Sequence, residues 1–255
     1  MKKITFEDIY TIGNIVFENT LYKHIHYPEM LNRYDSNFIQ FKHLPTLDEF
    51  KDTEDYLREF HFRRNQRHVK FYFPESEKPD ENEMNYLKKQ GYEVGYLELY
   101  TIQPNQFPRV ENSSDILIQP VTVDNFEAYL KLRFEQDLEF GKNFATQKID
   151  LNKRQFNNPA IMQIIASYKG KPAGAVDVIM TEKTAEIDSL DVNEFLRKKG
   201  IGSRLQYFVM KKFWDKTVLL VADGEDTPRE MYQKQNYQYG GFKYEVQKIY
   251  KEQAL

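Results

Sequence analysis

A basic, glycine-containing loop between an apolar strand pattern and an amphipathic helix pattern constrains this chain more than any other segment. The loop reads Arg-Lys-Lys-Gly-Ile-Gly and spans residues 197–202. Residues 185–192 before it alternate as a strand does, and residues 203–214 after it carry an apolar helical stripe of Leu205, Phe208, Val209 and Phe213. Two glycines let the backbone approach a bulky anion closely, and the unpaired N–H groups of a first helical turn point at such an anion. The sequence therefore predicts an anion site where this helix begins.

Other glycine-containing phosphate loops fit this segment less well. The loop of nucleoside-triphosphate-binding proteins ends in Gly-Lys-Ser/Thr, whereas Ser203 and Arg204 follow the second glycine here. A dinucleotide fingerprint needs three glycines and an acidic residue at the end of a second strand. Residues 217–223 do end in an acid, but only two of the three glycines are present. A turn that precedes a surface helix and binds nothing is the remaining alternative.

Three motifs occur in a fixed order around this loop. The strand before it ends in Leu-x-Val, the loop has the form Arg-x-x-Gly-x-Gly, and a later helix carries a Tyr followed five positions on by an aromatic residue. The residues concerned are Leu190, Val192, Arg197, Gly200, Gly202, Tyr232 and Tyr237. In this order they resemble the GNAT superfamily of acyl-CoA-dependent N-acyltransferases. Asn236 stands where that family usually has glycine, and because Asn tolerates a left-handed backbone, the departure is mild.

The resemblance implies that the second half binds acetyl-CoA as a co-substrate. The pyrophosphate is then expected on the amides of the loop, and the pantetheine arm along the end of the preceding strand, where its amides can pair as an extra strand would. A backbone N–H near Val192 is expected to face the thioester oxygen. The residues expected to bind the co-substrate are Leu190, Asp191, Val192, Arg197, Lys198, Lys199, Gly200, Ile201, Gly202 and Ser203.

Tyr232 is the candidate general acid, because its position matches the tyrosine of the family motif. A phenol with a pKa of about 10 stays protonated at neutral pH. It can pass its proton to a departing thiolate, whose conjugate acid has a pKa of about 8.5. The alternative is that Tyr232 is a half-buried aromatic residue on an amphipathic helix.

Two carboxylates, Glu186 and Asp188, are the candidate bases. Residues 109–255 contain no histidine, so a carboxylate, a tyrosine, the substrate or water must take up the proton of the amine. Glu186 lies eleven residues before Arg197, which is the spacing of the glutamate base in the histone-acetyltransferase branch that the chain resembles. Asp188 is expected on the same face of the strand. The alternatives are that both acids lie on a solvated strand face and that ordered water serves as the base.

Composition narrows the class of protein. The 255 residues are 40% hydrophobic and 15% aromatic, which favours a folded, strand-containing protein, and a net charge of −3 gives no reason to expect a nucleic-acid partner. Because cysteine is absent, disulfides, thiolate metal sites and a cysteine nucleophile are excluded. The five histidines match no tetrahedral spacing, so no metal is expected. No apolar run is long enough for a membrane span and the first residues lack a signal-peptide core, so we expect a cytoplasmic protein without a membrane partner.

The chain is expected to contain two units that meet in a polar linker at residues 103–115, which carries two prolines and no apolar periodicity. We therefore predict domains at residues 1–108 and 109–255. The expected fold class is α/β (α+β), with tandem GNAT-like units that are each a mixed, mostly antiparallel twisted sheet flanked by helices. Strands are predicted in the second half at 116–121, 162–168, 173–180, 186–192, 217–221 and 242–250, and helices at 125–136, 203–214 and 228–234.

The first half resembles the second in weakened form. Its predicted strands are 38–41, 68–73 and 92–102, and its predicted helices are 46–64 and 81–89. The segment YLKKQGYEVGYLELY resembles MYQKQNYQYGGFKYEV when Tyr92 is aligned with Tyr237, but Leu87 then falls on Tyr232 and the phosphate-loop motif is missing. We interpret residues 1–108 as a degenerate GNAT-like domain without a cofactor loop, and an unrelated α/β domain is the alternative. Three roles are open for this domain: it closes over the cleft, forms a homodimer or supports the fold.

Two functions from different classes are compatible with these residues. The first is an N-acetyltransferase that moves an acetyl group from acetyl-CoA to a primary amine of a small molecule or peptide, by direct attack in a ternary complex. The second is a catalytically silent sensor or scaffold protein that binds acyl-CoA. Four acidic residues, Glu135, Asp137, Glu186 and Asp188, would suit a cationic acceptor.

Overall fold

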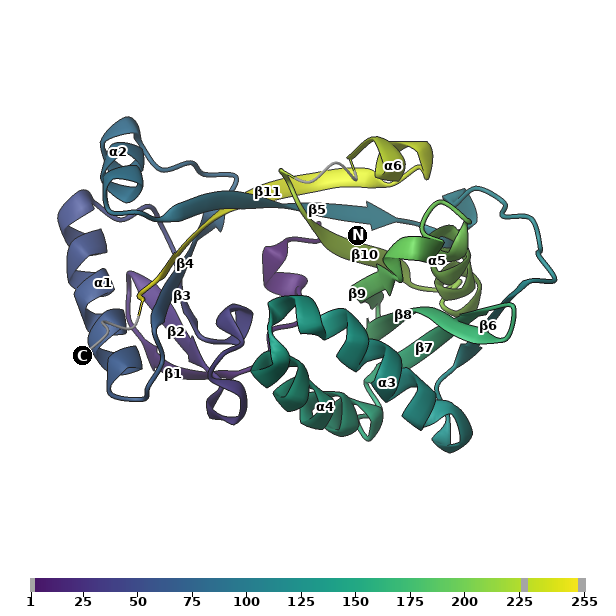
Figure 1. Ribbon diagram of the computed structural model, residues 1–255. Coiled ribbons are helices and arrows are strands. Elements are labelled where there is room, and N and C mark those ends of the chain that lie inside the picture. The colour runs from purple at the N-terminus through teal and green to yellow at the C-terminus, as the bar shows by residue number, and fades with distance from the viewer. Residues whose placement is uncertain (1–2, 226–228, 252–255) are drawn as a thin grey trace. The chain divides into compact units, whose positions relative to one another are not determined.

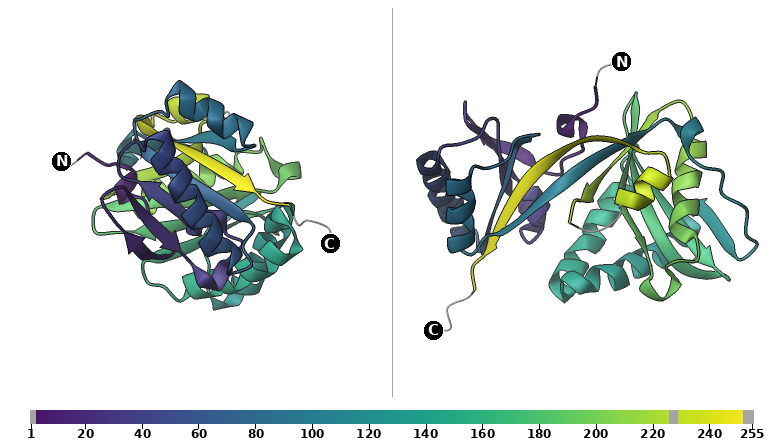
Figure 2. Two further views of the ribbon diagram at one scale, coloured as in Figure 1. Left: turned by 90° about the vertical axis from the view of Figure 1, so that its left-hand side faces the viewer. Right: turned by 90° about the horizontal axis from the view of Figure 1, so that it is seen from above.

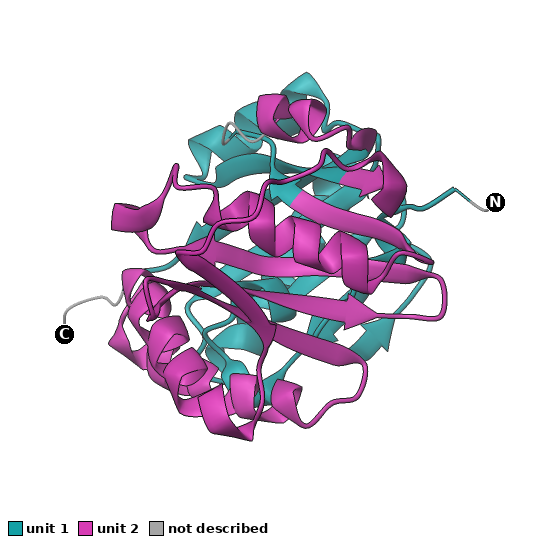
Figure 3. Ribbon diagram, turned by 90° about the vertical axis from the view of Figure 1, so that its right-hand side faces the viewer, with its two compact units in different colours: residues 1–99, 222–227, 240–255 teal, residues 100–221, 228–239 magenta. Residues whose placement is uncertain are grey.

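The computed structural model describes residues 3–225 and 229–251 (Figure 1). Figure 2 shows the same helices and strands from two further sides. The chain divides into two compact units, residues 1–99, 222–227 and 240–255, and residues 100–221 and 228–239 (Figure 3). These units are not the contiguous segments 1–108 and 109–255, because the last strand of the chain pairs with a strand of the first half. A boundary between sequence domains at 108/109 stays a prediction.

The first unit contains a mixed, mostly antiparallel sheet. Its strand order is β1 (Asn14–Glu18), β2 (Tyr22–His26), β3 (Phe38–Phe41), β4 (His68–Glu75) and β11 (Gln238–Ile249). Only β3 and β4 are parallel among these neighbours, and β11 runs antiparallel to β4, with Lys243 opposite Glu75 and Ile249 opposite His68. Strand β5 (Glu93–Ile102) begins in this unit, and 3-10 helices lie at Phe6–Asp8, Pro28–Met30 and Tyr34–Ser36.

Two helices, α1 (Leu47–Phe62) and α2 (Glu81–Lys89), lie next to each other on one side of this sheet (Figures 1 and 2). Phe50 and Leu57 of α1 and Leu87 of α2 are buried with strand residues of β3 and β4 in one core cluster. All five elements predicted for the first half are confirmed. Strands β1 and β2 were not predicted, because every residue of β1 is exposed and β2 buries two histidines in place of apolar residues.

The second unit contains the strands β6 (Ile116–Pro120), β7 (Ile161–Tyr168), β8 (Lys171–Met180), β9 (Thr184–Val192) and β10 (Thr217–Asp223). They are ordered β10-β9-β8-β7-β6, and neighbours are antiparallel except for β9 and β10, which are parallel. Its 3-10 helices lie at Pro104–Gln106, Val123–Asn125, Leu138–Phe140 and Glu194–Leu196. The expected fold class, a mixed and mostly antiparallel sheet flanked by helices in each unit, is therefore confirmed.

Helices cover both faces of the second sheet. Helices α3 (Phe126–Asp137) and α4 (Lys142–Phe156) contact β8 and β7 on one face, and α5 (Ile201–Lys212) contacts β8 and β9 on the other (Figure 2). A short helix, α6 (Arg229–Lys234), precedes β11. The predicted helices 125–136 and 203–214 are confirmed, and of 228–234 the structure describes 229–234 as helix. Helix α4 was not predicted, because its buried side includes Lys148, Asn152 and Gln155 in place of an apolar stripe.

Candidate functional site

The loop at residues 197–202 leads directly into α5, as predicted. Gly200 is the N-cap residue, with φ 77° and ψ 15° in the left-handed region, and no side chain caps the helix. The backbone N–H of Arg204 makes the first hydrogen bond of the helix, to Gly200 O over 3.2 Å. The N–H groups of the first turn, at Ile201, Gly202 and Ser203, precede that bond, and such groups need a partner from outside the helix. The first turn contains no acidic residue, so it suits an anion.

The two glycines of this loop serve different purposes. Gly200 needs its positive φ, and a Cβ there would also collide with the guanidinium of Arg204, whose Nη1 donates to Gly200 O over 3.0 Å. A Cβ on Gly202 would lie 3.8 Å from Leu190 Cδ2 and from Val192 Cγ2, which is ordinary contact. The protein itself therefore tolerates a small side chain at residue 202, and a glycine there leaves room next to the end of β9.

Strand β9 contains a bulge close to this loop. In its pairing with β8, Asp188 lies opposite Asp177 and Asp191 lies opposite Ala175. Three steps along β9 thus match two steps along β8, and Ser189 adopts a positive φ of 51° within the extra step. One extra residue reverses the alternation of side chains between the two faces of a sheet.

The bulge distributes the predicted site residues over both faces. Ala175 of β8 packs among residues of α3, and its partner Asp191 therefore also faces the α3 side. Asp177, two residues after Ala175, faces the same side, as does its partner Asp188. Glu186, two residues before Asp188, faces that side too. Leu190 and Val192 instead face α5, since their side chains lie next to Gly202. The residues predicted to bind the co-substrate and the predicted bases are therefore on opposite faces of β9, with Asp191 on the side of the bases.

Strands β9 and β10 provide an edge for an extended ligand. Their parallel register runs from Thr217 opposite Thr184 to Leu220 opposite Ile187. Both strands continue beyond this last pair, β9 to Val192 and β10 to Asp223. The backbone N–H of Val192 itself donates to Oδ1 of its neighbour Asp191 over 2.7 Å. A backbone N–H near Val192 that faces a thioester oxygen stays a prediction.

The candidate bases are less solvated than the simple strand-face alternative assumes. Glu186 is 8% exposed, in register with Ile179 of β8 and Leu219 of β10. Asp188 is half-buried beneath the α3 face. Their roles in catalysis stay predictions.

Tyr232 lies on α6 among other tyrosines. Its ring centroid is 4.9 Å from that of Tyr100 and 5.4 Å from that of Tyr237. The Tyr237 hydroxyl donates to Gln206 Oε1 of α5 over 2.8 Å, and burial raises the Tyr237 pKa well above its usual value. Asn236 between them has φ 65°, as expected for a residue in place of glycine. The half-buried Tyr232 thus contacts Tyr237, which in turn bonds to α5, and its function as an acid stays a prediction.

Comparison with known proteins identifies the family. The sequence profile of the acetyltransferase (GNAT) family matches residues 127–237, and that of a domain of unknown function (DUF5613) matches residues 4–100. Residues 127–237 belong to the GNAT family. The match covers the loop, α5 and Tyr232, so the resemblance that rests on these residues is confirmed. No curated protein matches the chain.

Several solved structures are similar to the chain over most of its length. A functionally unknown conserved protein from Staphylococcus epidermidis is 34% identical, with a TM-score of 0.89 over 98% of this chain and 99% of that one. A GCN5-related N-acetyltransferase from Sphaerobacter thermophilus has 14% identity and a TM-score of 0.60 over 89% of this chain and 76% of that one. Another from Kribbella flavida has 10% identity and a TM-score of 0.59 over 92% and 89%. At such low identity, the last two likenesses concern the fold alone.

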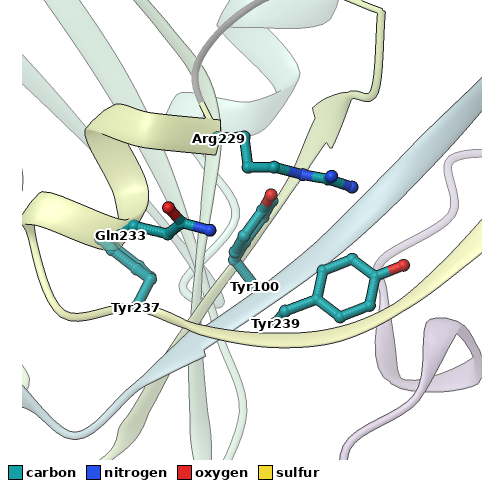
Figure 4. Close-up of a pocket in the computed structure, with 5 residues that line it drawn as sticks. All are labelled: Tyr100, Arg229, Gln233, Tyr237 and Tyr239. Atoms are coloured by element: carbon teal, nitrogen blue, oxygen red, sulfur yellow. The ribbon is translucent and has the colours of Figure 1, made fainter.

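A pocket of about 320 Å³ is lined by residues of α6, of the segment after it and of β5 and β11. Arg229 and Gln233 of α6 project over Tyr100 and Tyr239, with the Tyr100 hydroxyl directed toward Arg229 (Figure 4). Tyr237 completes the lining. The floor is aromatic, because Tyr100 and Tyr237 are buried, and the rim carries a guanidinium and an amide.

A second pocket of about 240 Å³ lies on the α3 side of β9, close to its bulge. Four acidic residues line it, Glu135, Glu139, Asp191 and Glu194, and Arg197 is the cation of the lining. Arg197 Nη2 lies 3.6 Å from Asp191 Oδ1, and its Nε donates to Val192 O over 3.3 Å. Of the four acids predicted to suit a cationic acceptor, only Glu135 lines this pocket. Glu139 and Glu194 were not predicted as site residues, because neither belongs to a motif.

Among residues 3–225 and 229–251, no group of three or more His, Cys, Asp or Glu side chains is arranged to hold a metal ion. None of the helices in the described part of the chain combines the length and apolar character that crossing a bilayer requires.

Proposed function

We propose that this GNAT protein is an N-acetyltransferase that moves the acetyl group of acetyl-CoA to a primary amine of a small molecule or peptide. The observation that carries the proposal is the open start of α5, where a left-handed Gly200 and an uncapped first turn leave backbone N–H groups for the diphosphate. Lys198 and Lys199 are exposed beside it and add positive charge. The residues present therefore fit the co-substrate that the family implies.

At the Ser189 bulge the side chains of β9 change from one face of the sheet to the other. This change supports direct transfer between two substrates bound on opposite faces. The pantetheine arm would follow Leu190 and Val192 on the α5 side, next to Gly202. The acceptor would approach from the α3 side, where Glu186, Asp188 and the acidic pocket lie. The amine and the acetyl group then meet at the end of the β9–β10 pairing, and no covalent enzyme intermediate is needed.

The reacting groups can be assigned to residues of this chain. The amine nitrogen bonds to the acetyl carbon as the C–S bond breaks, and the sulfur leaves with the bonding electrons. Glu186 or Asp188, directly or through water, would take the proton of the amine, and Tyr232 would give a proton to the departing sulfur. An alkylamine with a pKa of about 10.4 is mostly protonated at neutral pH, so acids near the acceptor would favour its binding while a base prepares it for attack.

A two-step experiment tests this function. Titration calorimetry with CoA measures binding, and a thiol-release assay with acetyl-CoA measures turnover over polyamines, amino acids, aminoglycosides and peptide N-termini. We expect binding of CoA and release of thiol with at least one amine. Absence of heat with CoA would refute the site itself. Binding without release by any amine would instead favour a silent sensor or scaffold protein.

A further inference from the structure

A buried hydrogen-bond network connects α3 to the bulge of β9. Arg133 donates from Nη1 to the backbone oxygen of Ser189 over 2.7 Å and from Nη2 to Asp177 Oδ1 over 3.1 Å. Tyr129, one helical turn earlier, donates its hydroxyl to the same Asp177 oxygen over 2.7 Å and accepts from Arg133 Nε over 3.2 Å. The side chains of Arg133 and Asp177 are only 6% and 3% exposed. One guanidinium therefore joins a helix, a neighbouring strand and the bulge.

Stability alone does not explain this ion pair. Two buried charges lose their hydration, and their attraction seldom gains more than that loss, so well-packed apolar side chains could hold α3 on the sheet at least as firmly. What an apolar pair cannot supply is a donor for a backbone oxygen that has left the regular ladder. The Ser189 oxygen is such an acceptor, because the bulge turns it toward α3.

The peptide group that carries the Ser189 oxygen also carries the N–H of Leu190. Ser189 and Leu190 are joined by a trans peptide, in which C=O and N–H point in opposite directions. Because Arg133 holds the oxygen on the α3 side, the N–H of Leu190 points toward the α5 side. The side chains of Leu190 and Val192 lie on that side, next to Gly202. The amide that Arg133 fixes is thus directed at the space where the thioester would lie.

We propose that Arg133 is a positioning residue for acetyl transfer, which fixes the Ser189–Leu190 peptide so that the Leu190 N–H meets the thioester oxygen as negative charge develops on it. The inference rests on the proposed function. It assigns the donor expected near Val192 to the Leu190 N–H, because the N–H of Val192 itself donates to Asp191. In this role Arg133 acts through the Ser189–Leu190 peptide. A preorganised donor of this kind contributes on the order of 10²–10³ in turnover, and a displaced donor loses part of that.

Two variants with different contacts test the inference. Arg133→Lys keeps a cation beside Asp177 but lacks the planar fork that reaches both Asp177 and Ser189. Tyr129→Phe is the matched control, because it removes the hydroxyl that bonds to Asp177 and to Arg133 Nε but no atom of the Arg133–Ser189 contact. Measurements on each are the melting temperature, CoA affinity, kcat and KM for acetyl-CoA, and hydrogen exchange of peptides covering residues 189–192.

We expect Arg133→Lys to lower kcat by about tenfold or more, to leave CoA affinity within about twofold, and to speed exchange at residues 189–192. Tyr129→Phe should lower the melting temperature and change kcat by less than about threefold. Equal losses of kcat in both variants, or an unchanged kcat in Arg133→Lys, would overturn the inference. A parent protein that releases no thiol with any amine refutes the proposed function instead, and unchanged exchange in Arg133→Lys would then still refute the fixed peptide.

A double variant covers the case in which Arg133→Lys does not fold. Arg133→Gln combined with Asp177→Asn leaves no buried charge without a partner, which is the main cause of collapse when one member of such a pair is removed. We expect the same selective loss of kcat with CoA binding retained. A double variant with the kcat of the parent would overturn the role of Arg133.

Discussion

Two strand–helix–strand segments, one in each unit, share a topology and differ at the start of the helix. In the first unit α1 connects the parallel strands β3 and β4, and in the second α5 connects the parallel strands β9 and β10. Helix α1 starts with a capping box, in which Thr46 N–H donates to the Glu49 carboxylate over 2.8 Å and Glu49 N–H donates to the Thr46 hydroxyl over 3.3 Å. Helix α5 starts at Gly200 without any side-chain cap.

The difference decides which segment can take an anion. Helix α1 satisfies its first N–H groups from its own sequence and carries Asp48 and Glu49 in its first turn, where their charges repel a phosphate. The Thr46 hydrogen bonds also lower the pKa of Glu49, which keeps that charge in place. Helix α5 leaves the same groups for a ligand. This contrast supports the interpretation of the first half as a GNAT-like unit that has lost its cofactor loop.

The largest expected effect is a pH dependence of stability that arises in the first unit. Burial lowers the pKa of His24 to about 3, of His61 to about 4 and of His68 to about 3, and all three lie in the first unit. The folded unit keeps them neutral below pH 6.5, whereas the unfolded chain binds protons there. Stability should thus be complete above about pH 6.5 and fall toward pH 4, by about 1.4 kcal/mol per pH unit for each histidine. Urea unfolding between pH 7.5 and 5 measures this.

One substitution and a control sharpen this prediction. His24→Leu removes a buried imidazole whose Nε2 has no hydrogen-bond partner among residues 3–225 and 229–251. It should reduce the slope of unfolding free energy against pH by about one histidine's share. His43→Gln changes an exposed histidine and should leave the slope unchanged. A parent slope near zero between pH 6.5 and 5 would contradict the argument.

Gly202→Glu should make the open helix start resemble that of α1. A carboxylate next to the first-turn N–H groups of α5 repels the diphosphate, so CoA affinity should fall by about 100-fold or more, with little change in melting temperature. Gly202→Ala is the control, because the protein has room for its Cβ 3.8 Å from Leu190 and Val192, and any loss of affinity then reports crowding of the ligand alone. If Gly202→Glu binds CoA as the parent does, the loop does not hold the diphosphate.

Tyr232 distinguishes α6 from its counterpart in the first half, where Leu87 stands. Tyr232→Phe should lower kcat by about 10-fold to 100-fold while leaving acetyl-CoA affinity nearly intact, because only the proton donor is removed. Tyr239→Phe removes the hydroxyl of another tyrosine whose ring also contacts Tyr100, and it is the matched control, expected to keep kcat within about threefold. A kcat that is equally unchanged in both variants would remove Tyr232 from the mechanism.

The sequence predicted the second unit well where local chemistry decides the structure. Gly200 and Asn236 were expected in left-handed or glycine-dependent positions, and both have positive φ. The bulge was not foreseen, because Ser189 gives no local signal for a positive φ and regular alternation was the simplest assumption. That assumption placed Asp188 correctly beside Glu186 but gave no hint that Leu190 and Val192 face the other way.

Residues that act through long-range contacts were also missed. Arg133 reads as an ordinary helix position, although its spacing of four from Tyr129 on the buried side of α3 was a usable signal. Its partners Asp177 and Ser189 are 44 and 56 residues away, so only the folded sheet brings them together. In the first unit, β2 was missed because its buried histidines do not follow an apolar strand pattern. Their packing partner Phe60 comes from α1, so this contact also depends on the folded chain.

The smallest expected effect is the reciprocal change at α1. Thr46→Ala removes the hydroxyl that accepts the Glu49 N–H, which should cost about 1 kcal/mol of stability, or a few degrees in melting temperature. It should leave CoA affinity and kcat at parent values, because the capped helix start holds no ligand. Thr46→Ser, which keeps an accepting oxygen, is the control and should stay close to the parent. A loss of CoA affinity in Thr46→Ala beyond that of Thr46→Ser would show that the two helix starts are not functionally distinct, since the capped one would then also contribute to binding.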